Sequence, residues 1–270
     1  MLRSILIFLL FFSYALNLSA EERKTLRIAY TSYPPFFIET KDPKHPIGVL
    51  TEFWEKQIAK LAHVDIDWIG PVSHPRAKKM VMDGEADAIN SIPLESAEKE
   101  KFVYSKKIRF FGRQGIAILK EDQMNVLRKP SDLNGKVIAK FGAGYMPDFF
   151  KNSGVRISEL ITSEDSVTRC FQMLFLNRVW GVYLVSAEVA PYYTAKMGKP
   201  NSIKVLLFPD TIPAFVASIG LSPKMKAEDA DKILRAGEHN DPKIYDFERT
   251  LNHYIREAEK EAIEEAKAKK

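Results

Sequence analysis

Residues 83–105 read DGEADAINSIPLESAEKEKFVYS, and four structural signals follow one another along this stretch. Gly84 is typical of a helix C-terminus, because glycine tolerates the left-handed conformation that often ends a helix. The nearly uncharged run at 86–92 predicts a buried strand. Ser96 and the acids after it predict a helical turn, and 102–105 is a second short apolar run. This order places a loop with free backbone donors at the end of a parallel strand, where open α/β sheets bind small ligands.

The composition indicates a globular chain. Of its 270 residues, 46% are hydrophobic, which is enough for a full core and for one or two domains. The net charge is only +5 and the basic residues are scattered except at the extreme C-terminus, so nucleic-acid binding is not expected. Cys170 is the single cysteine, which excludes an intrachain disulfide, and its helical surroundings predict a buried structural thiol. The sequence contains no HExxH motif, His/Cys metal spacing or nucleophile elbow, so we predict neither a metal nor a cofactor.

The first 20 residues have the features of a secretory signal peptide. Arg3 gives a positive start, residues 5–16 are almost wholly apolar, and small residues precede the acidic pair that begins at Glu21. An uncleaved anchor is the alternative, since Leu18 is not ideal three residues before the cut. No cysteine stands directly after the cleavage site, and no later segment is long and apolar enough to span a bilayer. We therefore predict a mature chain of about residues 21–270 outside the cytoplasm.

Several motifs, taken in order, carry a resemblance to a known family. A helix, the residues DGEADA, a strand, SAEKEK and FVYS follow one another along the chain. This order resembles that of the family 3 extracellular solute-binding proteins, which are the type II periplasmic binding proteins. In that family a helix ending in Gly-x-x-Asp-Ala is followed by a strand, a Thr-Pro-Glu-Arg-like loop and a Phe-Ser strand end. Residues 33–36 (YPPF) resemble the family's start, 130–136 (PSDLNGK) its Asp-Leu-x-Gly-Lys turn, and 177–184 (NRVWGVYL) its Gly-Arg-Val-Asp-Ala strand. The resemblance covers about residues 26–254.

The resemblance implies an α/β, two-lobed periplasmic-binding-protein type II fold with two crossover strands between the lobes. Lobe 1 would be discontinuous, formed by residues 21–119 and 211–270, and lobe 2 would be formed by residues 120–210. It also implies a periplasmic, monomeric protein that closes its lobes on a ligand by hinge motion. Beyond Ile255, residues 257–270 are nearly all Ala, Glu and Lys, which predicts a solvated helix extension or a frayed tail.

Six residues are the candidate ligand contacts. Arg76 is predicted near a helix N-terminus, where the helix dipole disfavours a cation unless an anion compensates. The strand, glycine-rich turn and helix start around residues 141–146 resemble an anion cradle of backbone amides. Tyr33 precedes the proline pair, where the family's aromatic residue stacks on the ligand. The full set is Tyr33, Arg76, Ser91, Lys99, Gly144 and Tyr145.

The ligand-binding motifs depart from those of the amino-acid binders in this family. Lys99 falls at the position of the arginine that clamps the ligand's α-carboxylate, and a lysine lacks that planar fork. Trp180 replaces the aspartate of the Gly-Arg-Val-Asp-Ala strand. Val185 and Ser186 occupy the region of the aspartate that pairs with the ligand's α-amine. We therefore predict a small polar or anionic solute other than a standard α-amino acid, delivered to a membrane transporter, such as an ABC-transporter permease, or to a sensor.

Two other functions stay open at this point. The fold also resembles that of some periplasmic dehydratases, for which Glu95, Glu98 or Glu188 would supply a general acid or base. A non-transport module that docks to a membrane receptor is the third hypothesis, with the C-terminal helix as its candidate surface. We favour the binding protein over the enzyme, because the sequence shows no catalytic constellation.

We predict that Lys99→Ala weakens the binding of an anionic ligand and leaves the fold intact, because a single ammonium can hold a carboxylate or phosphate. Titration calorimetry with the variant and the wild type measures this effect. An unchanged affinity would remove Lys99 from the site.

Overall fold

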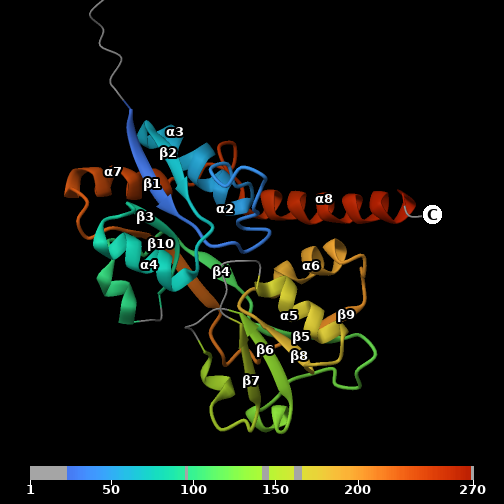
Figure 1. Cartoon of the computed structure of the whole chain (residues 1–270). Coiled ribbons are helices and arrows are strands. Elements are labelled where there is room, and N and C mark those ends of the chain that lie inside the picture. The colour runs from blue at the N-terminus through green and yellow to red at the C-terminus, as the bar shows by residue number, and fades with distance from the viewer. Residues whose placement is uncertain (1–22, 95–96, 142–145, 161–165, 269–270) are drawn as a thin grey trace, which may run out of the picture.

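The computed structural model describes residues 23–94, 97–141, 146–160 and 166–268. The predicted signal peptide therefore lies outside the described residues. The chain forms two lobes, each built on a five-stranded sheet (Figure 1). In the first lobe the strand order is β2-β1-β3-β10-β4, and in the second it is β7-β6-β8-β5-β9. The predicted α/β fold with two crossings between lobes is confirmed.

The first sheet combines strands from both ends of the described chain. β1 is parallel to β2 and β3, whereas β10 is antiparallel to β3 and β4. Its strands are β1 Lys24–Ala29, β2 Val64–Ile69, β3 Ala88–Pro93, β4 Phe110–Gly112 and β10 Phe215–Leu221. The predicted strand at 102–105 is reduced to a single bridge between Val103 and Leu221.

Helices cover both faces of the first sheet. On one face, Trp54 and Ile58 belong to the large hydrophobic cluster that contains Ile28 of β1. On the other, Val81 of α4 belongs to a smaller cluster with Ile89 of β3. The helices of this lobe are α2 Val49–Glu52, the π-helix η1 Phe53–Ala59, α3 Lys60–Ala62, α4 His74–Asp83, the 3₁₀ turn η2 Ala97–Lys101, and α7 Ala227–Glu238. Gly84 ends α4 in the left-handed region, at φ 78°, as the sequence predicts.

The second sheet is built from strands between the two crossings. β6 is parallel to β7 and β8, and β5 is antiparallel to β8 and β9. Its strands are β5 Gly115–Leu119, β6 Val137–Phe141, β7 Arg156–Leu160, β8 Gly181–Leu184 and β9 Ile203–Leu207. Its helices are η3 Pro130–Leu133, η4 Asp148–Phe150, α5 Ser166–Phe175, η5 Ala187–Val189 and α6 Ala190–Lys196. The sequence-based boundary at residue 119 put β5 in the first lobe, whereas β5 pairs within the second sheet.

The chain crosses from lobe 1 to lobe 2 between β4 and β5, which is the first crossing, and returns between β9 and β10, which is the return crossing. One buried glutamine joins the two crossings. Gln114 lies between β4 and β5, and its Nε2 donates a hydrogen bond to the carbonyl of Pro213 on the return crossing, at 2.7 Å. The hydroxyl of Tyr183 donates to Gln114 Oε1 at 2.5 Å, and the backbone N–H of Phe208 donates to the Gln114 carbonyl at 3.0 Å. Both crossings are therefore fixed to the same side chain.

The first crossing also lies against the backbone of lobe 2. A Cβ at Gly112 would lie 2.3 Å from the carbonyl oxygen of Val185 and 2.9 Å from Cβ of Ser186. Real Cβ atoms do not approach a backbone oxygen that closely, so only glycine fits at this position without a backbone shift.

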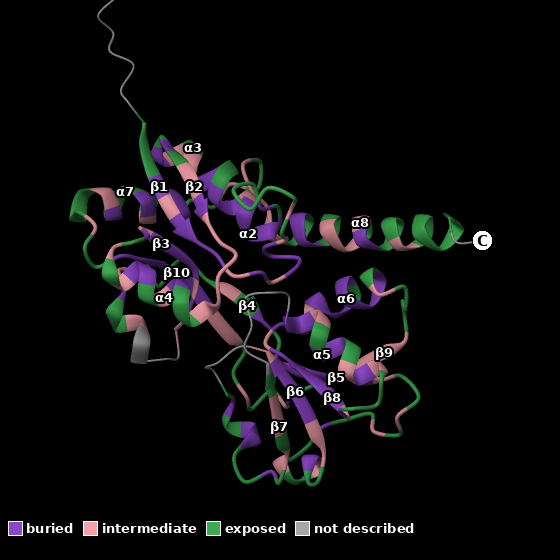
Figure 2. Cartoon of the chain, viewed as in Figure 1, coloured by how far each residue is buried: buried purple, intermediate pink, exposed green. Residues whose placement is uncertain are grey.

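The last helix, α8 Phe247–Ala268, contacts both lobes (Figure 1). It begins beside α2 in the first lobe and continues past α6 in the second. The sequence left a helix extension and a frayed tail open for residues 257–270, and the described part of this segment is helical. Burial along α8 decreases toward its exposed end (Figure 2).

We predict that Gly112→Ala destabilises the protein by roughly 1–3 kcal/mol, because the added methyl group overpacks the contact with Val185. Chemical denaturation at equilibrium measures the loss. Ala214→Ser, at an exposed position on the other crossing, is the matched control and should change the free energy of unfolding by less than about 0.5 kcal/mol. Equal stability of Gly112→Ala and the wild type would contradict the tight contact.

Candidate functional site

The two lobes meet where strands of both sheets end. Tyr33 follows β1 in the first lobe, and Phe141 is the last residue of β6 in the second. Their ring centroids lie 4.8 Å apart with an interplanar angle of 30°. Tyr33 also contacts Phe36, at 5.2 Å between ring centroids. Because open α/β sheets bind ligands at the carboxyl ends of their strands, this interlobe face is the candidate site, and Tyr33 lies in it.

Two buried oxygens at this end of the first sheet have no hydrogen-bond partner in the described part of the chain. They are Oγ1 of Thr31, just after β1, and Oδ1 of Asn90, on β3. Buried polar atoms are nearly always paired in native proteins, so each is available to a bound group. Sequence reasoning missed both residues. An asparagine inside the apolar run at 86–92 is the signal that could have identified Asn90.

The strand that carries Asn90 is bulged at that point. The register of β3 against β10 shifts between Ile89, opposite Gly220, and Ile92, opposite Ser218. Asn90 and Ser91 both fall inside this irregularity. Bulges re-aim side chains and are common beside functional sites. The predicted residue Ser91 is half-buried and lies next to Asn90.

The two predicted cations are both engaged within lobe 1. Lys99, on η2, donates from Nζ to the carbonyl of Leu94 at 2.8 Å, directly after β3. Arg76, on α4, donates from Nη2 to Glu85 at 2.8 Å, and its side chain is half-exposed. The structure therefore brings Lys99 to the end of β3, beside the strand of Ser91, and ties Arg76 to an acid on the surface. Gly144, Tyr145 and Glu95 lie outside the described residues, as does the side chain of Glu98.

Glu188, the third carboxylate considered for acid–base chemistry, is fixed at the first crossing. Arg113 donates from Nε to Glu188 at 2.7 Å, and the Ser186 hydroxyl donates at 2.9 Å. Burial alone would raise the pKa of Glu188, but the hydrogen bonds from Arg113, from its own backbone N–H and from Ser186 outweigh it and lower the pKa. A carboxylate held ionised in this way serves as an ionic clamp between the crossing and lobe 2.

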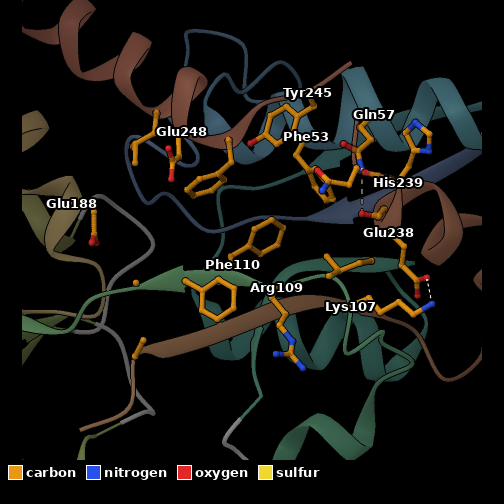
Figure 3. A pocket seen from close by; sticks show the side chains of 18 of the residues that line it. Phe53, Gln57, Lys107, Arg109, Phe110, Glu188, Glu238, His239, Tyr245 and Glu248 are labelled. Atoms are coloured by element: carbon orange, nitrogen blue, oxygen red, sulfur yellow. Dashed lines mark hydrogen bonds and ion pairs between the residues drawn. The ribbon is translucent and has the colours of Figure 1, made fainter. Parts of the chain in front are cut away.

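A cavity of about 690 Å³ borders the first crossing (Figure 3). Aromatic side chains from η1, β4 and the start of α8 line it, and Glu188 lies at its rim. The aromatic set is Phe53, Phe110, Tyr245 and Phe247. Phe53 contacts Phe110 edge-on, at 5.3 Å between centroids. Of the predicted ligand contacts that lie among the described residues, which are Tyr33, Arg76, Ser91 and Lys99, none lines this cavity.

Gln57, which also lines this cavity, makes a polar contact between two helices. Gln57, on the π-helix, donates from Nε2 to the carbonyls of Ala236, Gly237 and His239 at 3.0, 3.1 and 2.8 Å. These carbonyls lie at the end of α7, where a helix leaves its acceptors unpaired. Gln57 thus caps α7 and ties it to η1.

Among the described residues, no group of three or more His, Cys, Asp and Glu side chains could hold a metal ion. Within the same residues, no helix has both the length and the apolar character needed to cross a membrane.

Comparison with known proteins gives structural relatives only. No family model matches the sequence, and no curated protein matches it. An ancestral arginine-binding protein bound to glutamine is similar in structure, with a TM-score of 0.64 at 21% identity over 81% of this chain and 92% of that one. The two-lobed periplasmic-binding-protein fold is therefore confirmed. The more specific assignment to family 3 stays a prediction.

Two further relatives share this two-lobed fold. The amino acid ABC transporter substrate-binding protein AbpA from Streptococcus pneumoniae, bound to L-arginine, gives a TM-score of 0.65 at 16% identity, over 88% of this chain and 96% of that one. The periplasmic VFT2 domain of BvgS from Bordetella pertussis gives 0.64 at 15% identity, over 86% of this chain and 92% of that domain.

We predict that the Arg113–Glu188 pair makes stability depend on pH in the acid range. Because folding lowers the pKa of Glu188, the pair stabilises the protein fully above the unfolded value of about 4.3, and this contribution is lost as the pH falls through the folded value. Denaturation between pH 3 and pH 7 measures the loss. For a pair this exposed, we expect about 0.2–1 kcal/mol.

Glu188→Gln should make the free energy of unfolding depend less on pH between pH 3 and pH 7, and Arg113→Gln should do the same. The double variant should lose no more free energy of unfolding than either single variant, since the two residues act through one ion pair. Additive losses would show that the two side chains act independently.

Proposed function

We propose that this chain is an extracytoplasmic binding protein that encloses a small solute between its lobes. The contact that carries the proposal is the one between Tyr33 of the first lobe and Phe141 of the second. A solute entering between these rings would be sandwiched by both lobes, and its binding energy would favour the closed arrangement. The shared fold of substrate-binding proteins and of a sensor's periplasmic domain supports the proposal.

Polar groups at the same end of the first sheet as Tyr33 suggest how the solute is held. Oγ1 of Thr31 and Oδ1 of Asn90 would receive or exchange hydrogen bonds with it. Lys99 already donates to a neutral carbonyl, and its ammonium could turn from Leu94 to an anionic group, which makes a stronger, charge-assisted bond. A mostly apolar site with a few such polar groups is the usual character of a small-molecule site.

We propose that the solute is polar or anionic and differs from a standard α-amino acid. In the amino-acid binders of the family that this chain resembles, the planar fork of an arginine clamps the ligand's α-carboxylate. This chain has Lys99 at the corresponding position. The clamp also needs an acid for the α-amine, whereas the chain has Val185 and Ser186 in that region. Two of the structural relatives are bound to glutamine and to arginine, and their low identity to this chain leaves the solute free to differ.

The chain would present this solute to a membrane transporter or a sensor in the periplasm, as a monomer. A transporter partner is supported by the fold of the AbpA protein, and a sensor partner by the fold of the BvgS domain. The predicted signal peptide at residues 1–20 supports the same compartment.

A thermal-shift screen of residues 21–270 against amino acids, organic acids, sugars and phosphates tests this function. A solute at 100 times its dissociation constant adds about 2.7 kcal/mol, which raises the Tm by roughly 5–10 °C for a chain of this size. Mass spectrometry of the recovered solute separates binding from catalysis. A hit recovered unchanged supports the proposal, whereas a converted product supports the dehydratase-like enzyme. No shift with any class of solute contradicts the proposal.

Tyr33→Ala should reduce the shift given by any hit, because the solute loses one wall of the site. Phe111→Ala is the matched control, since it removes an exposed ring of β4 outside the interlobe contact. Equal losses for the two variants would place the solute elsewhere.

A further inference from the structure

The C-terminal helix α8 is anchored to the first lobe by two tyrosines. The Tyr254 hydroxyl accepts a hydrogen bond from the Gly48 N–H at 3.0 Å and donates one to Glu52 at 3.2 Å. The Tyr245 hydroxyl, just before α8, donates to the Val49 carbonyl at 2.9 Å. Burial, supported by the charge of Glu52, raises the pKa of Tyr254 to about 12, so this hydroxyl keeps its proton at neutral pH. The first half of α8 therefore moves with lobe 1.

One turn farther along, the same helix is held against the second lobe. Lys196, at the end of α6, forms an ion pair with Glu261 of α8. Ala258, one turn before Glu261 on the same face, is 2% exposed and belongs to the hydrophobic cluster that includes Tyr193 of α6. Figures 1 and 2 show α8 passing alongside α6, with its remaining turns exposed. A single continuous helix thus contacts both sides of the hinge.

The contact between α8 and α6 is open to solvent along one side. A cavity of about 390 Å³ lies beside it, lined by Glu259 of α8, by Pro191 and Thr194 of α6, and by Val205 of β9. The Lys196–Glu261 side chains are both partly exposed, and an exposed ion pair contributes little to the free energy of a contact. The pair can therefore form and break at modest cost.

We propose that α8 is an interlobe strap, which has to release α6 before the second lobe can rotate away about the two crossings. Lobe 2 turns about Gln114, whereas α8 is fixed to α2 through Tyr254. Opening therefore pulls α6 from Ala258 and breaks the Lys196–Glu261 pair. The strap sets the population of open lobes even without a solute. This inference deepens the proposed function, because it rests on the lobe motion that the proposed function requires.

The distance between the lobes, measured without a solute, tests the strap. Lys60→Cys on α3 and Lys151→Cys in lobe 2 place exposed labelling sites on different lobes, and the native Cys170 is buried. Single-molecule energy transfer between the two labels reports the open and closed populations. Glu261→Lys places two like charges together, and should raise the open-to-closed ratio about two- to fivefold, the range for one exposed ion pair.

The charge exchange Lys196→Glu/Glu261→Lys should restore the wild-type ratio. Lys260→Glu is the matched control, because Lys260 pairs with Glu257 within α8 and not across the lobes. Ala258→Gln should raise the ratio by at least about fivefold, since a larger side chain overpacks the contact. Ala266→Gln, at an exposed position on the same helix, should leave it unchanged.

The strap is overturned if Glu261→Lys and Ala258→Gln keep the wild-type ratio while circular dichroism shows that α8 is intact. If the variants shift the ratio but no solute does, the strap stands and the proposed binding function fails. If a solute closes the lobes and the variants change nothing, the binding function stands and the strap fails.

Discussion

The buried amide of Gln114 is the interaction on which the arrangement of the two lobes depends. Its nitrogen donates to the Pro213 carbonyl on one crossing, and its oxygen accepts from Tyr183 in the second sheet. A buried amide that lost these partners would retain the desolvation cost of unpaired polar atoms, so the two crossings are stabilised together. Two separate connections are thereby tied at one point, a pivot about which the proposed rotation of lobe 2 would be restricted to motions that both crossings can follow.

The surroundings of this pivot explain why the lobes are in contact in this structure. Gly112 lies against the backbone of Val185, and the Arg113–Glu188 pair holds the same crossing to lobe 2. One hydrophobic cluster also contains residues of both lobes, from Ile28 of β1 to Val182 of β8. These contacts hold the two lobes together around the pivot, and the interlobe face that contains Tyr33 is therefore closed in this structure. A solute between the rings of Tyr33 and Phe141 would have to displace their mutual contact, which favours a polar or anionic solute that also carries a flat group.

Sequence patterns were sufficient for the features that depend on neighbours along the chain. The left-handed Gly84 and the strand that follows it have local causes, whereas the two lobes were expected from the resemblance to a known family. The features that sequence patterns missed depend on distant partners. The bulge at Asn90 arises from pairing with β10, far along the chain, and the run at 102–105 forms only one bridge because Val103 meets a single residue of that strand. The composition of residues 257–270 predicts a solvated helix extension or a frayed tail, but the contact of α8 with α6 comes from the tertiary fold.

The π-helix η1 has a consequence for how the chain length can vary. A π-helical stretch holds more residues per turn than an α-helix, and here it places Gln57 under the three carbonyls at the end of α7. The wide turn holds about one residue more than an α-helix would, so a single deletion in 53–59 can be absorbed by regular α-helical winding, and the residues after the segment keep nearly the same orientation. The same deletion in a regular α-helix would rotate everything after it by about 100°. The segment 53–59 should therefore tolerate the loss of one residue better than a regular α-helix of the same lobe, such as α4.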